Sequence, residues 1–155
     1  MSQLSYEGRC HCGAIGFTYR TALPGDRWNI RACQCTFCRL HDALSTSDPQ
    51  GGLEFSIREP GQLQHYRFAG RTADFLLCRR CGVYVGAQMI AGDRALGIVN
   101  VHALLQPPSG LPPGRPTGSP CRPPRSARPR SRSRSPPGWR LRRIGRWALS
   151  SASTS

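Results

Sequence analysis

Apolar and polar residues alternate along several short stretches of the first hundred residues, which is the pattern of half-buried β-strands. Ile15, Phe17 and Tyr19 occupy every second position of one such stretch, and Gly, Pro or Asp interrupts the pattern repeatedly. Only residues 36–44 predict a helix, of one or two turns. Further candidate strands, recognised by alternating or β-branched residues, cover 28–32, 53–57, 64–68, 75–78, 83–89 and 95–101. The pattern therefore predicts a small, mainly β domain.

The composition changes at residue 106, beyond which Pro, Arg, Ser and Gly dominate. The chain has 22 basic residues, all arginine, against 8 acidic ones, for a net charge of +14. Eleven arginines and no acidic residue lie beyond 105, which leaves 11 − 8 = +3 for the first part. Because such a composition cannot bury a core, we predict a folded domain over 1–105 and a disordered tail over 106–155.

The tail contains an arginine–serine run at 125–136 that is similar to the repeats of RNA-processing proteins and would bind phosphates through charge. Three other interpretations remain open: a disordered tail without a partner, a basic amphipathic helix over 139–150, or the translation of a shifted reading frame of a GC-rich gene. We favour a tail without function, so nucleic acid is not an expected partner. Cys121, isolated among prolines, is interpreted as a free thiol.

Seven of the eight cysteines lie within the first 81 residues, in three tight clusters. Cys10 and Cys12 would point to the same side of an extended strand and could share one metal ion. The turn from Cys78 to Cys81 and Gly82 resembles a zinc knuckle, in which glycine allows a tight backbone turn. These two pairs complete a four-cysteine site that joins the N-terminal hairpin to the later strands.

The middle cluster, Cys33, Cys35 and Cys38, has no obvious fourth cysteine. Structural zinc takes four protein ligands, whereas catalytic zinc takes three and leaves a position for water or substrate. We therefore expect two zinc ions per chain, one structural and one exchangeable. A domain of this size has a thin core, so its folding should depend on the four-cysteine zinc.

Disulfides are the rival interpretation, but an odd number of clustered cysteines and the absence of a signal pattern in residues 1–8 favour a reduced metalloprotein. A redox role for Cys78 and Cys81 would need a helix opening at the motif, whereas residues 82–85 predict a strand. No apolar stretch approaches 18 residues, so no membrane span is expected. We predict a cytoplasmic protein, and the sequence carries no indication of its oligomeric state.

Three blocks in order, residues 8–17, 33–39 and 75–82, together with the strand-like 97–101, resemble the glutathione-dependent formaldehyde-activating (GFA) family, which shares its domain with centromere protein V (CENP-V). The resemblance extends from residue 4 to about 105. It implies small antiparallel sheets packed at an angle, a β-tent. It also implies a carbon–sulfur lyase that forms or breaks S-hydroxymethylglutathione from glutathione and formaldehyde, or a similar adduct. In that family Cys10, Cys12, Cys78 and Cys81 would hold the structural zinc, and Cys33, Cys35 and Cys38 the exchangeable one.

Residues beside the middle cluster are candidates for substrate contacts. Phe37 is placed to line a pocket, and Arg39 to offset the negative charge of several thiolates; Arg79 and Arg80 are further cations. His41 could instead close the second site as a fourth ligand and make it purely structural. His11 should face away from the metal of its neighbours. The other aromatic residues are interpreted as packing, namely Trp28, Phe55, Tyr66, Phe68, Phe75 and Tyr84.

The alternative to an enzyme is a non-catalytic zinc module in which His41 closes the second site and the basic tail contacts nucleic acid. An open site should exchange its fourth ligand with added thiols, whereas a closed site should not.

Overall fold

The structure, a computed structural model, describes residues 3–92 and 94–118, and it is mainly β as predicted. The expectations about the tail beyond 118 lie outside the described residues. They concern the disorder of the tail, the arginine–serine run at 125–136, the helix over 139–150 and the free thiol of Cys121.

One antiparallel sheet consists of β1 (Leu4–Arg9), β2 (Ile15–Thr21) and β5 (Gly52–Ile57), in the order β1-β2-β5. The alternation in β2 has the predicted consequence, because Ile15, Phe17 and Tyr19 are all buried. Phe17 pairs with Gly8 across the sheet, and a Cβ atom on Gly8 would lie 2.1 Å from Cζ of the Phe17 ring. Glycine is therefore required at position 8 to make room for that ring.

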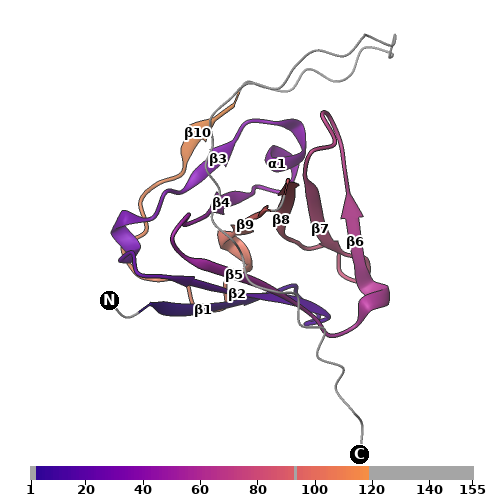
Figure 1. Cartoon of the computed structure of the whole chain (residues 1–155), viewed down its shortest axis with the longest axis horizontal. Helices are drawn as coiled ribbons and strands as arrows, with labels where there is room; N and C mark the ends of the chain where they lie inside the picture. The colour runs from indigo at the N-terminus through magenta and orange to yellow at the C-terminus, as the bar shows by residue number, and fades with distance from the viewer. Residues whose placement is uncertain (1–2, 93, 119–155) are drawn as a thin grey trace, which may run out of the picture.

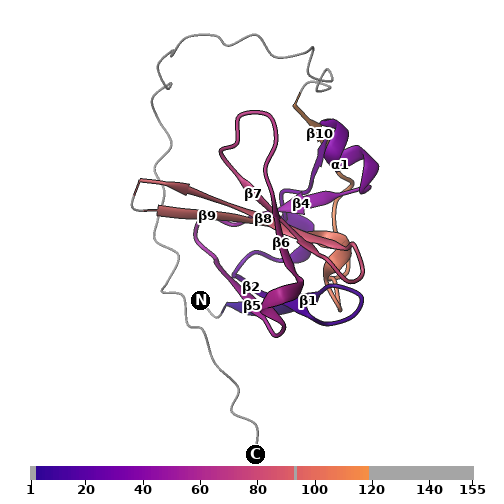
Figure 2. The same cartoon turned by 90° about the vertical axis from the view of Figure 1, so that its right-hand side faces the viewer.

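The second sheet has seven strands in the order β10-β3-β4-β9-β8-β7-β6, antiparallel except for the parallel pair β10 and β3. It rises over the three-stranded sheet on both sides, so that the two sheets meet at an angle (Figure 1), and the β8–β9 hairpin projects outward (Figure 2). In chain order its strands are β3 (Arg31–Cys33), β4 (Leu44–Thr46), β6 (Leu63–Tyr66), β7 (Asp74–Cys78), β8 (Tyr84–Ala91), β9 (Arg94–Asn100) and β10 (Arg115–Thr117).

The helical elements are short. The helix α1 (Thr36–Leu40) ends four residues before the predicted limit at 44, because Asp42 adopts a positive φ of 45° and Ala43 N–H turns back to the carbonyl of Cys38. The strand predicted at 28–32 begins only at Arg31, since Trp28 ends the first of three 3₁₀ turns. These turns are η1 (Gly25–Arg27), η2 (Pro60–Gln62) and η3 (Val101–Ala103).

The sheet continues past residue 105, where the sequence places the end of the domain. Arg115 N–H donates to the carbonyl of Ile30, and Gln34 N–H donates to the carbonyl of Thr117, both at 2.9 Å. Pro116 is tolerated between them because an edge strand does not need every N–H. This strand is held by backbone hydrogen bonds rather than by apolar side chains, so no hydrophobic pattern announces it.

Buried side chains form two groups. The larger lies between the sheets and contains Phe17, Trp28 and Val99 together with Cys10 and Cys78. The smaller surrounds α1 and contains Cys35, Cys38, Ala43, Tyr84 and Ala87. Each group thus includes thiols from one of the predicted metal sites. Among the residues that the structure describes, no helix has the length and apolarity needed to cross a membrane.

Candidate metal centres

The first pair of cysteines lies in the turn between β1 and β2, not on an extended strand as the spacing predicted. Cys10 N–H donates to the carbonyl of Ile15 at 2.9 Å, and Gly13 N–H donates to the carbonyl of Cys10 at 3.0 Å. Gly13 has a φ of 79°, a conformation that glycine adopts without steric cost. The tight turn, rather than strand alternation, brings the Cys10 and Cys12 sulfurs together.

The second pair forms a knuckle between β7 and β8. Gly82, with a φ of 75°, donates its N–H to the carbonyl of Cys78 at 2.8 Å, and Cys78 N–H donates to the carbonyl of Val83 at 3.0 Å. Gly82 therefore allows the tight backbone turn that was predicted from its position directly after Cys81. This knuckle belongs to the seven-stranded sheet, whereas the Cys10 turn belongs to the three-stranded sheet.

The four sulfur atoms of these two turns all lie within 4.8 Å of one another. Sγ of Cys12 is 3.6 Å from that of Cys10 and 3.5 Å from that of Cys78. Sulfurs at about 2.3 Å from a tetrahedral zinc would be about 3.8 Å apart, so the group fits such an ion. The donor set is also suitable, since four thiolates are a common structural zinc site.

The thiols of the knuckle differ in acidity. Burial raises the pKa of Cys78 to about 11. Burial also acts to raise the pKa of Cys81, but the N–H groups of Cys12 and Val83 outweigh it and lower the value to about 6. The turns therefore already place hydrogen-bond donors toward a thiolate at Cys81.

The middle cluster brings together Cys33 at the end of β3, Cys35 at the N-cap of α1 and Cys38 within α1. Their sulfurs lie within 4.8 Å of one another, and Cys35 and Cys38 are buried. Cys38 N–H donates to Sγ of Cys35 at 3.4 Å, and this bond and the neighbouring thiols lower the pKa of Cys35 against the opposing effect of burial. Burial raises the pKa of both Cys33 and Cys38. This group therefore consists of three thiols, and no other described residue adds a fourth metal ligand to it.

His41, the alternative fourth ligand, is not part of that group. Its ring instead packs against Phe37, with centroids 4.3 Å apart. Phe37 itself is enclosed by aromatic rings, whose centroids lie 4.8 to 5.6 Å away, those of Phe75, Tyr84, Phe68 and Tyr66. The structure thus places Phe37 beside the thiols and His41 outside the group of close ligand atoms.

The predicted cations have different environments. Arg39 is exposed on α1. Arg80 forms a two-pronged ion pair with Glu59, and Arg79 is exposed. A cation that the sequence analysis missed is Arg31, two residues before Cys33, whose charge acts on the buried Tyr84 hydroxyl. No local motif marks this role.

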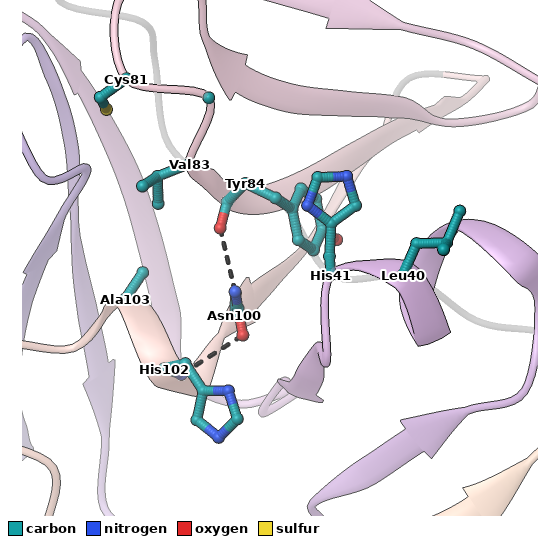
Figure 3. Close-up of a pocket in the computed structure, with 9 residues that line it drawn as sticks. Leu40, His41, Cys81, Val83, Tyr84, Asn100, His102 and Ala103 are labelled. Carbon is teal, nitrogen blue, oxygen red and sulfur yellow. Dashed lines mark hydrogen bonds between the residues drawn. The ribbon is translucent and has the colours of Figure 1, made fainter.

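A groove of about 420 Å³ lies between the knuckle at Cys81 and the end of α1 (Figure 3). It is bounded on one side by Cys81 and Gly82, and on the other by Leu40 and His41 at the end of α1. Its volume is in the range of small-molecule sites. The remaining lining residues are Val83, Tyr84, Asn100, His102 and Ala103. A second hollow, of about 490 Å³, is lined by His65, Arg67, Arg71 and Asp74 and by no cysteine.

Tyr84 stands out in this groove because its side chain is only 2 % exposed and its hydroxyl has no hydrogen-bond partner among the described residues. Asn100 holds the residue in place by donating from Nδ2 to the Tyr84 carbonyl at 3.0 Å, as Figure 3 shows. Burial raises the pKa of Tyr84 well above its usual range, and the thiols of Cys38, Cys33 and Cys35 add to the effect. The sequence pattern predicted only a packing role for Tyr84.

One family model matches most of the chain. The model of the family described as glutathione-dependent formaldehyde-activating enzyme matches residues 5–115. The chain is also similar to a Rhodobacter sphaeroides protein whose crystal structure was determined in a structural-genomics programme, and the two sequences are 32% identical. The matched region covers 69% of this chain and 91% of the Rhodobacter chain, with a TM-score of 0.48. No curated protein matches the chain.

Proposed function

The chain belongs to the family of glutathione-dependent formaldehyde-activating enzymes, and we propose that it is a zinc-dependent carbon–sulfur lyase. It would form or break the adduct between a thiol such as glutathione and formaldehyde or a similar small electrophile. The observation that carries the proposal is the group of three thiols with no fourth ligand among the described residues. The helix α1, which carries one of these thiols, borders an open groove at its C-terminal end.

Both cysteine groups suit zinc, and they suit different roles. Cys10, Cys12, Cys78 and Cys81 would hold a closed structural ion that joins the two sheets. Cys33, Cys35 and Cys38 would hold a second ion with an exchangeable position. Zinc bound there would supply a Lewis acid that keeps a substrate thiol in its thiolate form near neutral pH.

The chain's own residues would then orient the substrate and shield it from water. The rings around Phe37 form an apolar wall beside the three thiols, which suits a small electrophile such as formaldehyde. Arg39 and Arg31 would offset part of the negative charge that a fourth thiolate adds. The seven described cysteines are free thiols, which fits work in a reducing compartment such as the cytoplasm.

The test is a thiol titration of the full-length, cobalt-substituted protein. We expect two metal ions per chain and a change in the cobalt absorption spectrum as glutathione adds a fourth sulfur. S-methylglutathione, which has no free thiol, is the matched control ligand and should leave the spectrum unchanged. A spectrum indifferent to glutathione would refute an exchangeable site.

Turnover requires a separate measurement, because thiols add to formaldehyde without a catalyst. Magnetisation exchange in NMR spectra between formaldehyde and its glutathione adduct at equilibrium gives the rate in both directions. The native protein should raise this rate above the uncatalysed one. Cys35→Ser should abolish the increase.

A further inference from the structure

A buried hydroxyl that bonds to nothing is costly, because water no longer solvates it. The Tyr84 hydroxyl is in this condition although three thiols lie near enough for their charges to act on it. One other buried side-chain atom among the described residues shares the condition, Oγ1 of Thr46, and Thr46 does not line the groove. Tyr84 is thus a groove-lining residue whose buried hydroxyl has no partner among the described residues.

The position of Tyr84 is held from several sides. Phe37 packs edge-on against its ring with centroids 5.2 Å apart, and Phe75 lies 5.7 Å away. Asn100 fixes its backbone, and the carboxamide oxygen of Asn100 accepts from His102 N–H at 3.3 Å. The hydroxyl is therefore part of a rigid wall, which is the arrangement that makes a donor effective in catalysis.

The burial of the Tyr84 hydroxyl and the nearby thiols restrict the kind of hydrogen-bond acceptor that it could bind. A carboxylate would be repelled by metal-bound thiolates and would be expensive to bury. A neutral carbonyl or alcohol oxygen on a small substrate has neither disadvantage.

We propose that the Tyr84 hydroxyl donates a hydrogen bond to the oxygen of the electrophile, and to the alcohol oxygen of the thiol adduct formed from it. This assignment rests on the proposed function, and it makes Tyr84 a catalytic residue.

The reaction balances without further reagents. The substrate thiol releases its proton, the sulfur–carbon bond forms, and the π electron pair of the carbonyl moves to oxygen. That oxygen takes up one proton, so the sum of thiol and formaldehyde is the hydroxymethyl thioether. Tyr84 keeps its own proton and stabilises the negative charge while it develops on oxygen. In the reverse direction the same hydrogen bond holds the alcohol of the adduct.

A binding experiment on the full-length zinc protein tests this apart from turnover. The probes are S-(2-hydroxyethyl)glutathione and S-propylglutathione, which have nearly the same size and differ in that a terminal hydroxyl replaces a terminal methyl group. The native protein should bind the hydroxyethyl compound about tenfold more tightly, because the propyl compound leaves the hydroxyl unpaired. Tyr84→Phe should reduce the ratio to about one and slow the exchange reaction about a hundredfold.

Stability distinguishes this role from a structural one. Tyr84→Phe removes a hydroxyl that bonds to no described residue, so zinc content and melting temperature should stay unchanged or rise slightly. Tyr6→Phe, at a tyrosine of β1 that packs on Trp28 and does not line the groove, is the matched control and should retain the native ratio and rate.

The possible failures are separate. If the native protein neither binds these compounds nor accelerates exchange, the proposed function falls and this inference falls with it. If the native protein is active but binds both probes equally, or if Tyr84→Phe keeps the preference and the rate, only the assignment of Tyr84 is refuted.

Discussion

Replacing one ligand in each cysteine group should separate the structural centre from the exchangeable one. Cys78→Ser removes a ligand from the four-thiol group, and Cys38→Ser removes one from the three-thiol group. The pair is well matched, because Cys78 is 1 % exposed and Cys38 is 7 % exposed, so the burial that is lost is similar. The two variants differ mainly in the length of chain that a bound metal spans.

The difference can be estimated from loop closure. A metal shared by Cys12 and Cys78 cross-links positions 66 residues apart, which removes about 4 kcal/mol of unfolded-chain entropy. A metal shared by Cys33 and Cys38 spans only 38 − 33 = 5 positions, for which the same relation gives about 2 kcal/mol. A domain of this size has a total stability of about 5–15 kcal/mol, so the first loss is a large fraction of it.

Thermal unfolding followed by circular dichroism, together with metal analysis, measures the effect. We expect Cys78→Ser to lower the melting temperature by roughly 15–20 °C and Cys38→Ser by about half as much. Chelation of the native protein should unfold it only when the metal of the four-thiol group is removed. A drop for Cys38→Ser equal to or larger than that for Cys78→Ser would refute the reasoning.

Three further changes have defined outcomes. Gly8→Ala should destabilise the domain by about 1–3 kcal/mol in chemical denaturation, because its methyl group would overlap the ring of Phe17. Asp74→Asn should cost at most about 1 kcal/mol near neutral pH, since its partner Arg67 is solvent-exposed. The hydrogen bond from Arg67 lowers the pKa of Asp74, so this stability is complete above the ordinary value of 3.8 and is lost as the pH falls through the lowered pKa. His41→Ala should leave two metal ions per chain and an unchanged cobalt spectrum, because its ring packs on Phe37 outside the thiol group.

Each of these has a control or a contrary result. Gly61→Ala is the control for Gly8→Ala. A Cβ atom at position 61 would have no neighbouring atom within 4 Å, so this variant should keep the native stability. The stabilities of the native protein and Asp74→Asn should converge in strong acid, and a constant difference would show that the ion pair is not the cause. Loss of one metal ion in His41→Ala would show that this histidine is a ligand.

The sequence predicted the mainly β class and most of the strands, because alternation in a half-buried strand depends on neighbouring residues alone. It also identified the family, which the match over residues 5–115 confirms. It missed β1, whose residues are mostly exposed, and it missed β4 and β10, each three residues long and held by backbone pairing to β3. Such strands have little side-chain pattern to detect.

The cysteine groups were predictable to a similar extent. Spacing and resemblance together assigned the seven thiols to the two groups that the structure brings together. The local reason given for Cys10 and Cys12 was wrong, because two residues can approach one metal either from a strand or from a turn. Spacing does not distinguish these conformations.

The sequence by itself therefore determined the class of fold, the family and the division of the thiols, since strand alternation, the family's sequence blocks and the spacing within each cysteine cluster are all local patterns. Only the tertiary structure decided that His41 packs on Phe37 instead of joining the thiols, and that Tyr84, a residue of the groove, has a buried hydroxyl without a partner among the described residues. Tyr84 is the first residue of β8, whereas the three thiols lie in the segment that runs from the end of β3 into α1. Their proximity results from the packing of these elements around one small core, which no local pattern records.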